Sequence, residues 1–221
     1  MKWYFFPFYF ISDLWLILRN RALYHFYRVP PKSWKTGARG DVVLIQGLNA
    51  RWVSLKKIGK AIHKQGYRIH IVEKLENNTK PVIQGSADIS HYIESNNLKN
   101  VILVGHSKGA INAICLLKNP DIAQRIKMII NIAGPLKGTL LTRFYLTGRE
   151  LEPGSDLIKH YNEGINSKKI VNLFPLIDDM VIPNKSLRGD HEINKPINVF
   201  GHIRIVESRQ TIREIKSLLN S

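Results

Sequence analysis

A serine between two glycines stands at the centre of the segment best suited to chemistry. Residues 101–104 form a continuous apolar run typical of a buried parallel strand, and the pentapeptide Gly-His-Ser-Lys-Gly at 105–109 follows it directly. A helical pattern over 108–118 comes next. A sharp turn from strand to helix holds a serine hydroxyl out in the open, and the first N–H groups of the helix face the charge that develops during attack. This setting predicts Ser107 as a nucleophile.

A serine hydroxyl needs a general base within hydrogen-bond reach and a carboxylate that orients this base. Where the serine lies on such a strand–turn–helix elbow, the chain order is serine, acid, histidine. Of the eight histidines, only His191 and His202 come after the acid candidates. His202 follows a predicted strand at 197–200 and precedes the last helical pattern, which favours it as the base. His191 lies in a polar stretch typical of a solvated loop.

Two adjacent aspartates are candidates for the acid. Asp178 and Asp179 come shortly after a predicted strand at 169–174. Because sites in parallel sheets form at the carboxyl ends of strands, both side chains are placed to orient the base. The residues alone leave the choice between them open.

The elements that must position these residues alternate between apolar runs and amphipathic segments from Asp41 onward. This alternation predicts an α/β fold of three layers, with a mostly parallel central sheet and helices on both faces. The predicted strands are 42–45, 68–73, 101–104, 126–132, 169–174 and 197–200, and the predicted helices are 53–65, 85–96, 108–118 and 208–219. Residues 41–221 then form one catalytic domain, in which the glycine- and proline-containing region 135–168 is a small cap-like insertion.

Several motifs in this order resemble those of the compact bacterial lipases and esterases of the α/β-hydrolase superfamily. The resemblance covers approximately residues 41–219 and rests on the segments 42–48, 105–109, 132–139, 153–157, 179–183 and 201–202. Asp179-Met180-Val181-Ile182-Pro183 resembles the Asp-x-Val-Val-Pro acid loop of that family. The resemblance therefore implies Asp179 as the acid, with Asp178 as a turn-forming or supporting residue.

The same resemblance implies that the backbone N–H groups of Leu48 and Lys108 form an oxyanion hole, where each donor supplies a few kcal/mol to the transition state. Two residues depart from the family pattern. Gln46 stands where many relatives have a histidine, and Lys108 occupies an elbow position that is commonly apolar or amide. The Lys108 side chain either brings a cation to the site, favouring acidic substrates, or points to water.

The activity implied by the resemblance is that of a serine hydrolase that cleaves carboxylic esters through an acyl-enzyme on Ser107. The sequence offers no convincing site for a metal or an organic cofactor. A thioesterase, an acyltransferase or an amidase on the same triad is the alternative among enzymes. A catalytically silent, membrane-bound binding module is the alternative outside them.

Residues 1–40 are expected to form a membrane-associating segment and a linker. The apolar run 3–18 is interrupted by Ser12 and Asp13 and is shorter than the ~20 residues of a spanning helix. Its aromatic members favour an interface, and basic residues follow it; these are Trp3, Tyr4, Tyr9 and Trp15, then Arg19, Arg21, Arg28, Lys32 and Lys35. An anchor of this kind would keep the catalytic domain on the cytoplasmic side. A signal peptide and a helix packed on the domain are the alternatives.

The chain is strongly basic, with 33 Lys and Arg against 17 Asp and Glu, a formal charge of +16. Such a surface attracts anionic partners, either acidic lipids or nucleic acid. Nucleic acid is disfavoured because the basic residues accompany no helix-turn-helix, zinc-finger or RNP-like pattern. Cys115 is the only cysteine, so an internal disulfide is excluded. The expected partners are therefore a small-molecule or lipid ester substrate and an anionic membrane surface, without nucleic acid, and no oligomeric state is indicated.

Overall fold

The computed structural model describes residues 6–144, 148–161, 167–190 and 192–220. Its centre is a six-stranded sheet in the order β2-β1-β3-β4-β5-β6, in which every neighbouring pair is parallel. The strands are β1 (Asp41–Ile45), β2 (Arg68–Ile71), β3 (Val101–His106), β4 (Ile126–Ile132), β5 (Ile170–Ile177) and β6 (Ile193–Phe200). The predicted α/β class and all six predicted strands are confirmed.

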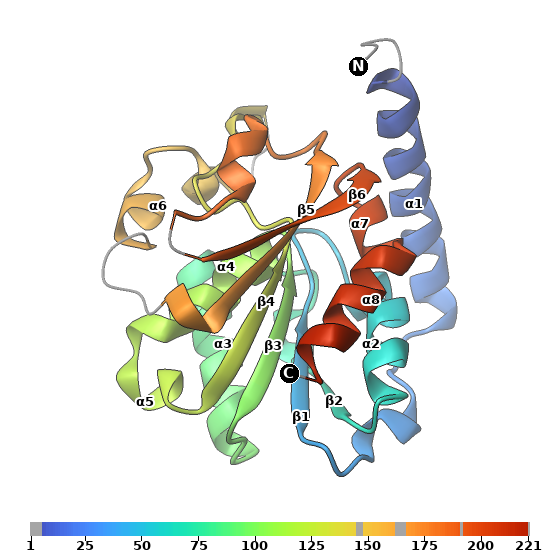
Figure 1. Cartoon of the computed structure of the whole chain (residues 1–221), viewed down its shortest axis with the longest axis vertical. Helices are drawn as coiled ribbons and strands as arrows, with labels where there is room; N and C mark the ends of the chain where they lie inside the picture. The colour runs from blue at the N-terminus through green and yellow to red at the C-terminus, as the bar shows by residue number, and fades with distance from the viewer. Residues whose placement is uncertain (1–5, 145–147, 162–166, 191, 221) are drawn as a thin grey trace.

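The α-helices come before, between and after the strands in the chain, and Figure 1 shows how they surround the sheet. They are α1 (Phe6–Phe26), α2 (Lys56–His63), α3 (Val82–Ser95), α4 (Lys108–Cys115), α5 (Pro120–Ala123), α6 (Asp156–Tyr161), α7 (Arg204–Glu207) and α8 (Arg209–Leu218). Two of the predicted helices are broken into an α-helix and a 3-10 turn, η3 (Trp52–Leu55) before α2 and η5 (Leu116–Lys118) after α4. The short helices α5 and α7 were not predicted.

Helices cover both faces of the sheet and give three layers, because side chains alternate between the faces along each strand. Val42 and Leu44 of β1 lie in a core with residues of α2, α7 and α8. Val43 and Ile45 lie in a second core, with residues of α3 and α4. Both faces of β1 are therefore buried, which explains why it has no polar positions between Val42 and Ile45.

Helix α1 packs along the domain beside α7 and α2 (Figure 1). Leu16 is buried, and Leu23 and Tyr24 pack against the core that α2, α7 and α8 share. Arg19 forms an ion pair of 2.5 Å with Glu207 of α7. These contacts match the packed-helix alternative for this segment. Across the described residues, no helix combines the length and apolarity that crossing a bilayer requires. The aromatic Trp3 and Tyr4 lie outside the described residues.

Two connecting regions differ in how they are packed. The expected linker contains η2 (Lys32–Lys35), whose Trp34 is buried and makes an edge contact with Trp52 at 5.5 Å between ring centroids. Trp34 therefore attaches this segment to the domain core, where its indole buries a large apolar surface. In its described residues, the cap-like region between β4 and β5 contains α6 and the 3-10 turns η6 (Leu140–Phe144), η7 (Arg149–Leu151) and η8 (Ser167–Lys169).

Candidate active site

Ser107 occupies the turn between β3 and α4 with a backbone conformation of φ 55° and ψ −129°, which is strained for a residue with a side chain. The flanking glycines are required by space. A Cβ on Gly105 would lie 2.5 Å from the Cα of Ala110, and one on Gly109 would lie 2.5 Å from the Gln46 carbonyl oxygen. The predicted strand–turn–helix elbow is therefore present, with Ser107 at its tip.

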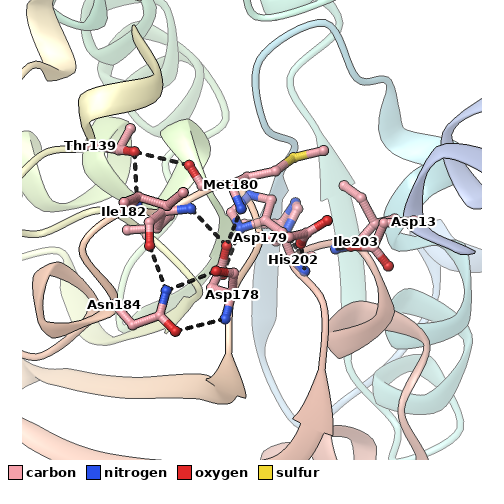
Figure 2. Close-up of polar contacts among 12 residues, drawn as sticks. Asp13, Thr139, Asp178, Asp179, Met180, Ile182, Asn184, His202 and Ile203 are labelled. Atoms are coloured by element: carbon pink, nitrogen blue, oxygen red, sulfur yellow. Dashed lines mark hydrogen bonds and ion pairs between the residues drawn. The ribbon is translucent and has the colours of Figure 1, made fainter. Parts of the chain in front are cut away.

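His202 lies in the loop after β6, and its ring is bonded to Asp178. Its Nδ1–H donates to Asp178 Oδ2 over 2.8 Å, and both side chains are buried. Asp179 makes a different contact, because its Oδ1 accepts the backbone N–H of His202 at 2.9 Å. The prediction that Asp179 orients the imidazole is wrong in this geometry. Figure 2 shows the two aspartates beside His202. The alternative base, His191, lies outside the described residues.

The turn after β5 explains why Asp178 holds the ring. Asp178 Oδ1 accepts the backbone N–H groups of Met180 and Val181, each at 2.8 Å, so its carboxylate is fixed by the turn that it begins. Asn184 adds a bond from its amide to the Asp178 carbonyl at 2.8 Å (Figure 2). Asp179, which the resemblance implied as the acid, bonds to the His202 backbone instead.

His106, the last residue of β3, forms a hydrogen bond to the backbone of His202. Its Nε2–H donates to the carbonyl oxygen of His202 at 3.0 Å, and the two ring centroids are 4.8 Å apart. Burial, and then the nearby His202, lower the pKa of His106 to about 3. His106 therefore stays neutral and serves as a donor. Only its place inside the pentapeptide marks it in the sequence.

The charges around His202 favour its protonated form. Burial opposes the imidazolium, but the carboxylate of Asp178, together with Asp179 and Asp13, outweighs burial and raises the pKa of His202. Burial in turn raises the pKa of Asp179, helped by the charge of Asp178 and opposed by the bond and charge of His202. The imidazole is thus a base whose conjugate acid is stabilised by surrounding carboxylates.

The backbone donors expected from Leu48 and Lys108 lie at the same end of the sheet. Both residues line one cavity with Ser107 and His202. A Cβ on Gly47 would lie 3.1 Å from the Ser107 Cβ, so the loop after β1 passes close to the serine. Gln46 fixes this loop, because its amide donates to the Glu76 carbonyl at 2.8 Å. The glutamine thus replaces the family histidine with a structural contact.

The side chain of Lys108 behaves differently from both expectations. Its exposed fraction is 1%, and its Nζ donates to the Lys80 carbonyl at 2.5 Å and pairs with Glu150 Oε1 at 3.2 Å. Glu150 also accepts the N–H of Val82 at 2.9 Å, at the start of α3. Burial lowers the pKa of Lys108, and Glu150 opposes this shift. The ammonium therefore ties the elbow to the cap region and to α3, and neither points to water nor stands free beside the serine.

The cavity has a volume of about 630 Å³, and several separate parts of the chain line it in addition to the elbow of Ser107. Helix α1, the 47–54 loop, the cap region and the loops around His202 all contribute to it. Most of the surface that faces the cavity is apolar, and Ile17, Leu48, Val53, Leu151, Val181 and Val206 are among the residues that line it. Among the described residues, no group of His, Cys, Asp or Glu is arranged to hold a metal ion. The site is a largely apolar cavity lined in part by Ser107 and His202.

No protein-family model matches the sequence. Among solved structures, the chain resembles the mature lipase BlEst2 of Bacillus licheniformis with a TM-score of 0.60 and 16% identity, over 86% of this chain and 94% of that one. A structure from a study of carboxylesterases of Nitrososphaera gargenis gives 0.60 and 12%, over 83% and 93%. The thioesterase domain of the curacin biosynthetic pathway gives 0.59 and 14%, over 84% and 93%. These likenesses confirm the α/β-hydrolase fold that the motifs predict.

Proposed function

We propose that the protein is a serine hydrolase that cleaves carboxylic esters through an acyl-enzyme on Ser107. The observation that carries the proposal is that Ser107, on a strained elbow, and His202, bonded to the buried Asp178, line the same cavity. A serine in this setting has a base beside it and a carboxylate that fixes the tautomer of the base. The lipase and carboxylesterase with the same fold support this reaction class.

The first half of the reaction forms the acyl-enzyme. The Ser107 oxygen bonds to the ester carbonyl carbon, and its proton passes to His202 Nε2. The backbone N–H groups of Leu48 and Lys108 stabilise the negative oxygen of the tetrahedral intermediate. The C–O bond to the alcohol then breaks, and His202 returns the proton to the leaving oxygen. Asp178 stabilises the imidazolium while it exists.

The second half releases the acid. A water molecule attacks the acyl carbon and gives a proton to His202, which then protonates the Ser107 oxygen as the acyl bond breaks. Among the described residues, no hydrogen bond joins the Ser107 hydroxyl to His202. The mechanism therefore requires this contact to tighten when substrate fills the cavity, as catalytic hydrogen bonds do in other enzymes.

The cavity supports an ester with an apolar acyl chain as the substrate class. Its volume lies in the usual range for small-molecule sites, and its walls are mostly apolar. A thioester is the second candidate, supported by the thioesterase domain among the structural neighbours. The two substrates share the acyl-enzyme and differ only in the leaving group, an alcohol or a thiol.

The test of the proposed function is hydrolysis of a panel of aryl esters and acyl thioesters by the full chain. We expect turnover that increases with acyl length until the cavity is filled, and loss of at least about 1,000-fold in Ser107→Ala. Ser95→Ala removes an exposed hydroxyl from α3 and serves as the control with unchanged turnover. Undiminished hydrolysis by Ser107→Ala would refute the proposal.

We also propose that the protein works at an anionic membrane surface. Ile11, Leu14, Trp15 and Leu18 form an exposed apolar row on α1, spaced so that they share one face of the helix. Exposed basic residues follow this row, at Arg21, Arg28, Lys32 and Lys35. An apolar face that enters the lipid, combined with cations that contact acidic head groups, is the pattern of an interfacial helix.

Vesicle sedimentation tests the membrane proposal. We expect binding to vesicles with acidic lipids, weaker binding to neutral vesicles, and a loss of about tenfold in Trp15→Glu because one interfacial aromatic side chain becomes a charge. Ile83→Glu is the matched control, since Ile83 on α3 is also 59% exposed but lies on the other side of the sheet. Equal losses in the two variants, or no binding by the unaltered chain, would contradict the proposal.

A further inference from the structure

We propose that Asp13 of α1 is a positioning residue of the active site, which holds the loop that carries His202. The proposal rests on the role of His202 in the proposed function. It makes the N-terminal helix a part of the catalytic unit, in addition to any role at a membrane.

The contact between Asp13 and the loop is direct. Asp13 is fully buried, and its Oδ2 accepts the backbone N–H of Ile203 at 2.5 Å. Gly201 has φ 106°, and a Cβ there would lie 2.7 Å from Asp13 Oδ1, so the carboxylate occupies space that only a glycine leaves open. Figure 2 shows Asp13 and Ile203 together on the side of His202 away from Asn184. The residues on both sides of His202 therefore contact Asp13.

Asp13 completes a set of four contacts around one residue. Asp178 holds the His202 ring, Asp179 accepts its N–H, and His106 donates to its carbonyl. The next peptide N–H along the chain is held by Asp13. The first three contacts come from loops and strands of the sheet, whereas the fourth comes from a helix 190 positions earlier.

A carboxylate buried in an apolar helix is costly unless it has a specific partner. Asp13 Oδ1 has no hydrogen-bond partner among the described residues, so the bond to Ile203 is the contact that accounts for its placement. Burial, and then the charge of Asp179, raise the pKa of Asp13 to about 7, with Asp178 acting in the same direction and the Ile203 N–H and His202 opposing. Asp13 also helps to raise the pKa of His202.

The rest of α1 ties the position of Asp13 to the cavity. Ile17, Asn20, Arg21 and Tyr24 of the same helix line the cavity. The Arg19–Glu207 ion pair and a hydrogen bond from Arg51 to the Tyr24 hydroxyl attach the helix to the domain. A shift of α1 would therefore move one wall of the cavity and the support of His202 together.

The test compares Asp13→Asn and Asp13→Ala in the full chain. Asparagine keeps an oxygen that accepts the Ile203 N–H, whereas alanine removes it. We expect Asp13→Ala to lower kcat about tenfold with little change in KM, and Asp13→Asn to restore most of kcat. In both variants the ascending limb of the pH–rate profile should move to lower pH, because a negative charge near His202 has been removed.

Two readouts that do not depend on activity separate this inference from the proposed function. NMR titration should show a lower pKa for His202 in both variants, and hydrogen exchange of the Ile203 N–H should accelerate in Asp13→Ala. Asp41→Asn is the control, because Asp41 is a partly buried carboxylate at the start of β1, held by Arg68 at 2.7 Å. If the unaltered chain cleaves no ester or thioester while these shifts appear, the proposed function fails and the positioning contact stands. Unchanged His202 titration and Ile203 exchange in both variants would overturn the inference.

Discussion

The loops at the carboxyl ends of the strands hold His202 itself, and the N-terminal helix holds the residues next to it, but these two regions differ in how much their sequences reveal. The loops after β3, β5 and β6 carry Ser107, Asp178 and His202, each shortly after the end of its strand. Helix α1 carries Asp13 inside an apolar segment that has no motif. The candidate site residues therefore lie in short patterns that can be recognised in the sequence. Asp13, which supports one of them, lies in a distant segment, and its contribution depends on how α1 packs on the domain.

The largest expected effect comes from replacing the two adjacent aspartates one at a time, which tests which carboxylate orients the His202 ring. Asp178→Asn should lower kcat by on the order of 10³-fold, because an amide no longer fixes the tautomer of His202 or stabilises its imidazolium. Asp179→Asn keeps an oxygen that accepts the His202 N–H and should lower kcat less than tenfold. Steady-state kinetics on one aryl ester checks both variants. A larger loss in Asp179→Asn would restore the assignment that the motif spacing implied.

A smaller effect is expected in the pH dependence of stability, which tests the burial of Asp13 in α1. The pKa of Asp13 is raised from an ordinary value near 3.8 to about 7, so the folded protein holds a proton there that the unfolded chain has lost between those pH values. The ionised carboxylate therefore destabilises the fold progressively as pH rises from about 4 to 7, and fully above that. Asparagine does not titrate. We expect the Tm of Asp13→Asn relative to the unaltered chain to be higher by about 3 °C or more at pH 8 than at pH 4.5.

Differential scanning calorimetry at these two pH values measures this difference. His202, whose pKa is raised, contributes stability that is full below about 6.5 and is lost as pH rises through its folded pKa, which acts in the same direction in the unaltered chain. Asp41→Asn is again the control, because the pKa of Asp41 is lowered and its sign is opposite. A Tm difference for Asp13→Asn that is independent of pH would contradict the burial of an ionisable group at this position.

The fold and the strand–turn–helix elbow around Ser107 could be predicted because their determinants are local. A strand such as β3 is buried on both faces and needs an uninterrupted apolar run, and the elbow needs Gly105 and Gly109 at fixed distances from Ser107. His202 could be found because few histidines follow the acid candidates. These patterns can be recognised in the sequence without knowledge of the tertiary contacts.

The carboxylate that bonds to the His202 ring could not be assigned from the sequence, because its position depends on the pairing between strands. The register of β5 with β6 shifts between Pro175 and Ile177, where β6 contains one residue more than β5. Such an irregularity changes which side chains face each other, just before the two aspartates. A motif aligned by spacing records the composition of the loop but not this shift. It therefore placed Asp179, and not Asp178, on the imidazole.

The supporting contacts could not be predicted from the sequence either, because they depend on tertiary packing. Lys108 finds Glu150 in the cap region, and Trp34 of the expected linker finds Trp52, through tertiary packing that no local pattern encodes. Asp13 interrupts an apolar run, which at the sequence level only weakened the case for a spanning helix. In the structure the same residue is the contact between that helix and the loop of the proposed base.

Covalent labelling tests directly whether the Ser107 hydroxyl is activated as a nucleophile. A fluorophosphonate reacts with a serine only when a base activates its hydroxyl, so the folded chain should acquire one adduct, located on Ser107 by peptide mass spectrometry. The adduct should be absent in Ser107→Ala and should form far more slowly in His202→Gln, at a Tm that shows both variants folded. Labelling at another residue, or none in the folded unaltered protein, would contradict the account.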